Sequence, residues 1–213
     1  MITLSHLSKT LGNQNILSDV SFTITSGERL IILGQNGAGK TTLIRCILGE
    51  YQPSSGEVRV LGFAPFKNRV RALEHIAFVP QLPPPLRYTV KELFDYCADV
   101  TDCDRNTIRS YCDYFELDVN AHIHKPFYKL SGGMKQKVLI SIAFARSSPI
   151  LIFDEPTANL DVVARDRFRS LLSDNRCRDK TMIFISHRIE EVSNVVKRSI
   201  ELDLGKVVKD VLL

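Results

Sequence analysis

The stretch that most constrains the fold is the loop at residues 34–42, which reads Gly-Gln-Asn-Gly-Ala-Gly-Lys-Thr-Thr. It fits the pattern G-x-x-x-x-G-K-[ST], closed by Gly-Lys-Thr at 39–41. The apolar run 30–33 before it predicts a buried strand. Residues 42–48 after it carry apolar side chains at helical spacing, with Gly49 as a stop. The loop therefore lies between a strand and the start of a helix, which is the context that this pattern requires.

Such a loop is built to hold phosphate groups. Glycines let the backbone approach closely and turn successive N–H groups inward, and the helix N-terminus adds positive potential. Lys40 can reach the β- and γ-phosphates of a nucleotide, and the Thr41 hydroxyl can bind Mg²⁺. The alternative, a glycine-rich turn followed by Lys-Thr by chance, does not explain why both flanks fit. The predicted nucleotide-binding residues of the loop are Gly34, Gln35, Asn36, Gly37, Ala38, Gly39, Lys40, Thr41 and Thr42.

Size and composition set the class of protein. The chain has 213 residues, 44% hydrophobic and 24% charged, as in a globular protein of one large domain or two small ones. No apolar run approaches the roughly 20 residues that cross a bilayer, and the N-terminus resembles no signal peptide. A net charge of +4 is too small to indicate nucleic acid. The five cysteines form no CxxC pair, and their odd number without a signal sequence predicts reduced thiols in the cytosol.

Strand and helix patterns alternate along most of the chain. The expected strands are residues 1–5, 20–24, 30–33, 57–61, 76–79, 150–153, 182–186, 199–202 and 207–211, the last two forming a hairpin. The expected helices of these α/β parts are residues 42–48, 134–145, 165–172 and 189–196.

The region between residues 89 and 130 has a different, helical character. Val90, Leu93 and Phe94 fall at helical spacing, and a second group around Ile108 does the same. This pattern predicts a helical insert between two α/β halves. The proline run 83–85 before it cannot lie inside a helix or a central strand, so it predicts a stiff, extended connector.

Two acids follow a buried strand pattern. Asp154 and Glu155 come directly after the apolar run 150–153, which places carboxylates at the edge where parallel sheets bind ligands. Asp154 could hold Mg²⁺, in part through water, and Glu155 could polarise a water that attacks a γ-phosphate. Acid pairs at strand ends are common, so it is the combination with the phosphate loop that indicates catalysis.

Ser131, Gly132 and Gly133 form a second turn before a helix. A serine hydroxyl, glycine N–H groups and a helix N-terminus together predict a second anion site. Ser131 could equally serve as an ordinary helix N-cap, and the two roles are compatible.

Taken in order, these motifs resemble the ATP-binding subunits of ABC transporters over essentially the whole chain. Residues 34–41 match the Walker A loop, Gln81 the Q-loop glutamine, 130–136 the LSGGQ signature with Met134 in the usual glutamine place, 150–155 Walker B with its catalytic glutamate, 159–161 the D-loop, and His187 the switch histidine.

The resemblance implies an α/β fold of the P-loop NTPase type. Its RecA-like mixed sheet core would carry an antiparallel N-terminal β part and an inserted α-helical subdomain. The chain would be one ATP-binding domain, with residues 1–85 and 131–213 as the catalytic core and about 86–130 as the helical subdomain.

The resemblance also implies an ATPase that drives a separate transmembrane permease from the cytoplasmic face of the membrane. Two copies would dimerise head to tail around two ATP, with a homodimer the simplest case. The residues implied for catalysis are Glu155, His187 and Lys40, and those implied for Mg²⁺ are Thr41, Gln81 and Asp154. ATP would be bound by the Walker A loop and, in addition, by Ser131, Gly132, Gly133 and Asp161. The permease would dock on the helical insert and residues 83–85.

Two positions depart from the family pattern. Leu11 stands where many relatives place an aromatic residue that stacks on adenine, so we expect poor discrimination between ATP and GTP. A signature with Met134 in the usual glutamine place resembles the signature of ABC-2-type exporters.

Two other classes of function stay open. Soluble ABC ATPases of translation usually carry two cassettes, and those of DNA repair insert a long coiled coil, whereas this sequence has one cassette and no heptads. A regulatory ATP binder without turnover is disfavoured because Glu155 and His187 are both present.

Overall fold

The computed structural model describes residues 1–213, which form two compact units. The first unit contains residues Met1–Ile76 together with Asp179–Leu213, and the second contains Ala77–Arg178. No helix is both long and apolar enough to cross a membrane.

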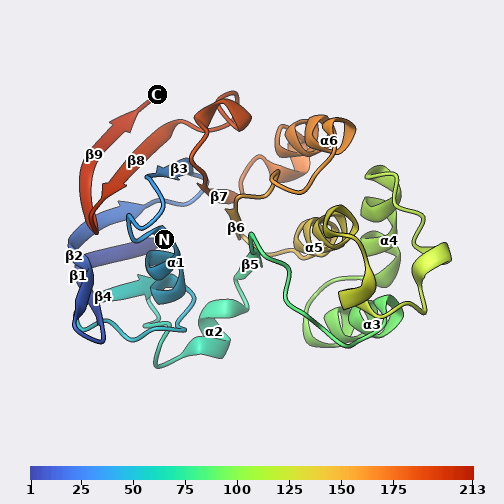
Figure 1. The fold of residues 1–213 in the computed structure, drawn as a ribbon, viewed down its shortest axis with the longest axis horizontal. Coiled ribbons are helices and arrows are strands. Elements are labelled where there is room, and N and C mark those ends of the chain that lie inside the picture. Colours follow the sequence, from blue (N-terminus) through green and yellow to red (C-terminus); the bar gives the residue numbers. More distant parts are fainter. The chain divides into compact units, whose positions relative to one another are not determined.

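The first unit opens with an antiparallel sheet of β1 (Ile2–Leu11), β2 (Gln14–Ile24) and β4 (Ser55–Val60), in the order β2-β1-β4. Figure 1 shows these strands side by side in blue and teal. Every second residue near the start of β1 is buried, as the alternation of apolar side chains predicts. This sheet confirms the predicted antiparallel N-terminal β part.

The predicted ranges 1–5 and 20–24 were too short, because β1 continues to Leu11 and β2 begins at Gln14. Pairing continues beyond the apolar alternation because register shifts, the first between Leu4 and Leu7, let the strands bend and stay hydrogen-bonded. A pattern of alternating burial cannot reveal these extensions, because it is broken at each shift.

The second sheet of this unit contains β3, the strand that leads into the phosphate loop. β3 (Arg29–Leu33) lies between β7 (Thr181–Ile185) and β8 (Arg198–Asp203) and is parallel to both, and β9 (Lys206–Leu212) pairs antiparallel with β8. Side chains at the centre of β3 are fully buried, which confirms the expected buried strand. The predicted C-terminal hairpin is confirmed as well.

Two helices complete the first unit. α1 (Lys40–Ile47) follows the phosphate loop and confirms the predicted helix, whereas α2 (Arg69–Leu73) was not predicted. The predicted helix at residues 189–196 is wrong, because only a 3₁₀ turn, Ile189–Glu191, forms there. Valines 192, 195 and 196 are buried at helical spacing, but β-branched residues around Ser-Asn have low helix propensity, so the segment stays a series of turns.

The second unit contains neighbouring strands β5 (Ile76–Val79) and β6 (Ile150–Asp154) and four helices. The helices are α3 (Val90–Val100), α4 (Arg105–Tyr114), α5 (Gly132–Ala145) and α6 (Val162–Leu172), with 3₁₀ turns at Asn120–His122, Phe127–Lys129 and Asn175–Cys177. Helices α5 and α6 begin two and three residues earlier than predicted, because Ser131 and Asp161 cap their N-termini.

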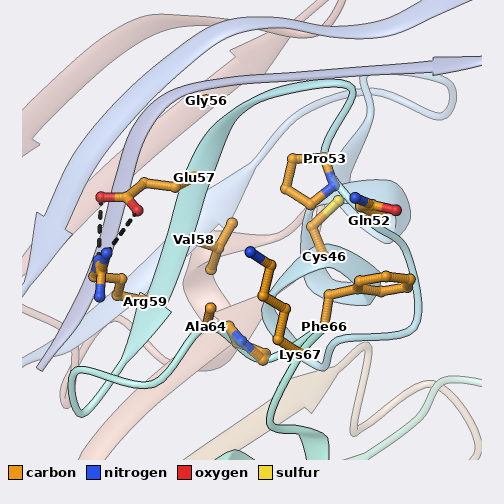
Figure 2. A pocket seen from close by; sticks show the side chains of 11 residues that line it. Cys46, Gln52, Pro53, Gly56, Glu57, Val58, Arg59, Ala64, Phe66 and Lys67 are labelled. Carbon is orange, nitrogen blue, oxygen red and sulfur yellow. Dashed lines mark hydrogen bonds and ion pairs between the residues drawn. The ribbon is translucent and has the colours of Figure 1, made fainter.

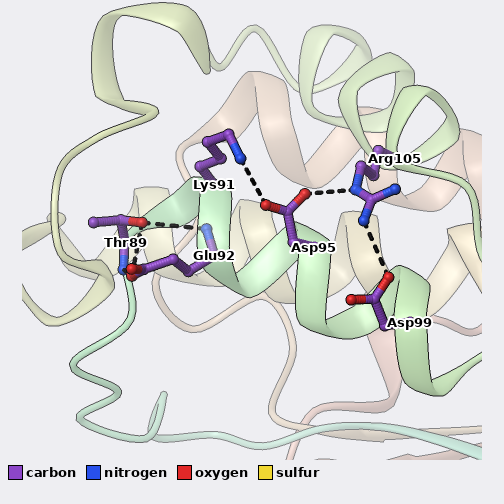
Figure 3. Close-up of polar contacts among 6 residues, drawn as sticks. All are labelled: Thr89, Lys91, Glu92, Asp95, Asp99 and Arg105. Carbon is purple, nitrogen blue, oxygen red and sulfur yellow. Dashed lines mark hydrogen bonds and ion pairs between the residues drawn. The ribbon is translucent and has the colours of Figure 1, made fainter.

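The start of α3 is fixed by a capping box, which Figure 3 shows. The Thr89 hydroxyl accepts the Glu92 N–H at 3.2 Å, and the Glu92 carboxylate accepts the Thr89 N–H at 2.7 Å. Asp95 of α3 binds Lys91 at 2.8 Å and Arg105 at the start of α4 at 2.5 Å, and these two cations lower its pKa. These contacts join the exposed faces of α3 and α4.

Candidate functional site

The phosphate loop runs from the end of β3 to the N-cap of α1. Gly39 has φ of +103°, and a Cβ there would lie 2.8 Å from Leu17 Cδ2 and 2.9 Å from the Ile16 carbonyl oxygen. Only glycine satisfies both the left-handed backbone and this close approach. The glycine in the pattern is therefore required by packing against β2, in addition to the phosphate binding that the sequence predicts.

Lys40 folds back over the loop that it follows. Its ammonium donates to the carbonyl oxygens of Gly34 at 2.6 Å and Gln35 at 3.0 Å. Thr41 is exposed at the start of α1, where the first backbone N–H groups of a helix lack intrahelical partners. A positive charge, a hydroxyl and helix N–H groups thus converge on one place, and this donor set fits a Mg²⁺-bound triphosphate.

The turn between β8 and β9 supports the phosphate loop. The sequence did not predict this contact. Gly205 donates its N–H to the Ala38 carbonyl at 3.1 Å and accepts the Ser18 N–H at 2.9 Å. A Cβ at Gly205 would lie 2.3 Å from the Ile16 carbonyl oxygen. The sequence predicted a hairpin turn here, but nothing local to residues 203–206 indicates that it contacts the loop.

His187 lies at the same sheet edge as the loop. β7 and β3 are parallel with Ile185 opposite Ile32, and the Ser186 N–H donates to the Ile32 carbonyl at 3.4 Å. His187 follows directly and is exposed. The structure therefore brings the predicted histidine and the Walker A loop to one end of the same unit.

The Walker B acids lie in the second unit, at the end of β6. The aromatic ring of Phe153 packs against Phe168 and Phe144, with ring centroids 5.3 and 5.7 Å apart. Asp154 ends the strand, and Glu155 has φ of +45°, a left-handed conformation that non-glycine residues seldom adopt. Strain of this kind is typical of functional sites.

Three further predicted residues of the second unit lie at its surface. Gln81 is exposed two residues beyond β5. Ser131 is exposed, and its hydroxyl accepts the Met134 N–H at 3.2 Å, so the predicted N-cap role is confirmed. Asp161 caps α6 by accepting the Ala164 N–H at 2.8 Å and pairs with Lys137 at 3.0 Å, and these contacts lower its pKa. Gly132 and Gly133 form the first turn of α5.

A separate cavity in the first unit is not part of these motifs. It has a volume of about 310 Å³ and is bordered by β4 and the turn around Phe66 (Figure 2). Cys46 is buried at its edge, and burial raises the pKa of that thiol to about 11. The thiol therefore stays protonated at neutral pH, and all five cysteines of the chain are free.

Comparison with known proteins decides the family. The family model described as "ABC transporter" matches residues 17–158. This chain belongs to the ABC transporter family. It is 32% identical to the ABC transporter ATP-binding protein NatA of Bacillus subtilis, over 98% of this chain and 88% of NatA. It is 36% identical to the Nod factor export ATP-binding protein I of Rhizobium johnstonii, over 98% of this chain and 68% of that protein.

Solved structures agree with this assignment. An ATP-binding subunit of an ABC transporter superposes with a TM-score of 0.89 at 25% identity, covering all of this chain and 90% of the other. A bacterial ABC transporter cassette solved as a dimer superposes with a TM-score of 0.85 at 27% identity, covering 100% and 99%. The predicted P-loop NTPase fold is confirmed, and the chain is an ATP-binding and ATP-hydrolysing subunit of an ABC transporter.

Proposed function

We propose that two copies of this chain enclose two Mg²⁺–ATP head to tail, each nucleotide lying between the Walker A loop of one copy and the signature turn of the other. The observation that carries this proposal is the pair of anion-binding helix N-termini, α1 behind Lys40 and α5 behind Ser131. The dimeric cassette among the similar structures supports it.

Each predicted residue has a distinct task in hydrolysis. Lys40 leaves the loop carbonyls to bind the β- and γ-phosphates, and the loop N–H groups hold the same oxygens. Thr41, Asp154 and Gln81 would hold Mg²⁺, which offsets phosphate charge when bound. Glu155 orients the attacking water and accepts its proton, and His187 donates a hydrogen bond to the γ-phosphate. Positioning and charge stabilisation supply most of the rate.

The proposal extends to the partner and the place of action. A separate transmembrane permease would bind the subunit at the cytoplasmic face of the membrane, through the helical region and residues 83–85. Export is the direction that we propose, because relatives include Nod factor export proteins and Met134 resembles the exporter signature. Co-purification of a polytopic membrane protein with this subunit tests the permease partner. Co-purification of a translation or repair complex in its place would favour a soluble ATPase.

The experiment that tests the catalytic assignment is Glu155→Gln. The substitution keeps the shape of the side chain but loses the charge that orients water, so ATP should bind while hydrolysis falls by orders of magnitude. Size-exclusion chromatography with ATP and Mg²⁺ should then show an accumulated dimer. Glu201→Gln, at an exposed position of β8, is the matched control. A Glu155→Gln protein that stays monomeric and hydrolyses ATP normally means that the general base is another residue.

A further inference from the structure

A buried glutamine joins α5, the helix that follows the signature turn, to residues 155–161, the loop that follows β6 in the second unit. The Gln136 side chain lies in the second turn of α5 and is fully buried, at 0% exposure. Its Nε2 donates to the carbonyl oxygen of Pro156 at 3.3 Å. Pro156 directly follows Glu155, so this hydrogen bond holds the backbone next to the catalytic carboxylate.

Two more contacts join the same pair of segments. A Cβ on Gly133 would lie 2.9 Å from the Asn159 carbonyl oxygen, so α5 approaches the D-loop as closely as glycine allows. One turn later, Lys137 Nζ binds Asp161 Oδ2 at 3.0 Å, and the Lys137 side chain is only 14% exposed. Residues 156–161 are therefore held against the first two turns of α5 along their length.

Stability does not explain a glutamine at this position. Gln136 Oε1 is buried and has no hydrogen-bond partner. An unpaired buried acceptor destabilises a fold. An apolar side chain of the same length would remove the unpaired Gln136 Oε1 but leave the Pro156 carbonyl unpaired. The number of unpaired acceptors would stay the same, so the glutamine brings no net gain in stability. Glu155 beside it has a left-handed backbone, which persists only where its surroundings hold it.

We propose that Gln136 is a positioning residue that fixes the Glu155–Pro156 backbone. Through the same hydrogen bond, a movement of the signature turn at the start of α5 would shift this backbone. This inference rests on the proposed head-to-tail dimer. There, Ser131 contacts the nucleotide of the partner subunit, while Glu155 acts on the nucleotide of its own subunit. A shift of α5 on γ-phosphate binding moves the Gln136 amide and with it the general base, which couples the two ATP sites.

The test is Gln136→Met, which keeps the length and bulk of the side chain and removes its amide. We expect kcat to fall by about ten- to a hundredfold, the range that small misplacement of a catalytic group produces. The KM for ATP should stay within about twofold, because the Gln136 amide donates to the Pro156 carbonyl and not to a predicted nucleotide-binding group. The melting temperature should stay within about 4 °C of the wild type.

The matched control is Ser141→Ala on the same helix. Ser141 is also 0% exposed, but its hydroxyl donates to the Lys137 carbonyl of α5 itself at 2.8 Å, so kcat should not change. Transmission is tested by combining Gln136→Met with Ser131→Ala. Effects on kcat that multiply independently would overturn transmission, whereas a double variant no slower than the slower single variant supports it.

The outcomes separate this inference from the proposed function. Wild-type kcat in Gln136→Met, with Glu155→Gln inactive, overturns the positioning role and leaves the function intact. A melting temperature that falls enough to account for the lost activity also overturns it, because Gln136 would then be structural. Normal hydrolysis by Glu155→Gln instead removes the proposed catalytic assignment.

Discussion

Arg198 connects three parts of the first unit near the start of β3, the strand that leads to the phosphate loop. Its guanidinium binds Asp210 of β9 at 2.6 Å, Glu28 before β3 at 2.7 Å and the Thr23 carbonyl of β2 at 2.8 Å. The side chains of Arg198 and Glu28 are each 16% exposed, and that of Asp210 is 35% exposed. The change that we consider is Arg198→Met, which removes the charge and keeps the apolar stem.

The expected cost follows from this burial. Breaking a buried ion pair costs about 3–5 kcal/mol, because the partner charge is left uncompensated, whereas an exposed pair is worth about 0–1 kcal/mol. The intermediate exposure of Asp210 reduces the first figure, so Arg198→Met should lower the free energy of unfolding by about 2–4 kcal/mol. Urea unfolding followed by circular dichroism should show a midpoint lower by about 1 M or more.

The pH dependence of this effect has a definite sign. Hydrogen bonds from Arg198 lower the pKa of Asp210, and although burial acts to raise the pKa of Glu28, hydrogen bonds from Thr25 and Arg198 bring it below its usual value. Carboxylates with lowered pKa values stabilise the fold above their unfolded values, which lie near about 4. The difference between wild type and Arg198→Met should therefore be complete at neutral pH and shrink below about pH 4.

The control is Arg59→Met in β4 of the same unit. Arg59 pairs with Glu57 at 3.0 Å, and the two side chains are 51% and 50% exposed, so solvent screens the pair. This variant should lose no more than about 1 kcal/mol. Equal losses in the two variants at neutral pH would refute the reasoning, because burial would then not decide the strength of the pair.

The remaining predictions concern the nucleotide. Lys40→Ala should weaken ATP binding and abolish turnover without unfolding, which a binding titration and circular dichroism can check; a folded variant with wild-type ATPase activity would remove the phosphate-loop assignment. Leu11 is 38% exposed at the end of β1, and the wild type should bind ATP and GTP within about tenfold of each other. Leu11→Tyr should tighten nucleotide binding by about 1–3 kcal/mol through stacking, and a strong ATP preference in the wild type would contradict this.

The sequence by itself determined the elements whose function depends on residues close together in the chain. The phosphate loop could be predicted because its glycines, Lys40 and the flanking strand and helix lie within about twenty consecutive residues. The same holds for the Ser131 cap, whose donor is three residues away. The domain boundaries and the roles of the site residues stay predictions.

Apolar spacing failed as a guide to conformation in two places, for different reasons. The apolar spacing of residues 189–196 correctly marked buried valines but predicted a helix that weak propensity does not sustain. β1 and β2 run past their apolar alternation because each provides the hydrogen-bonding partner of the other. The length of these two strands therefore does not follow from one segment alone.

Only the tertiary structure decided what holds the functional segments in place. Gly205 reaches the Walker A loop at Ala38 across more than 160 residues of chain, and Gln136 reaches Pro156 across 20 residues. Hydrogen bonds of this kind leave no periodic pattern, because each needs one donor and one acceptor that the fold brings together. The sequence therefore predicts which groups do the chemistry, and the packing of distant segments determines their geometry.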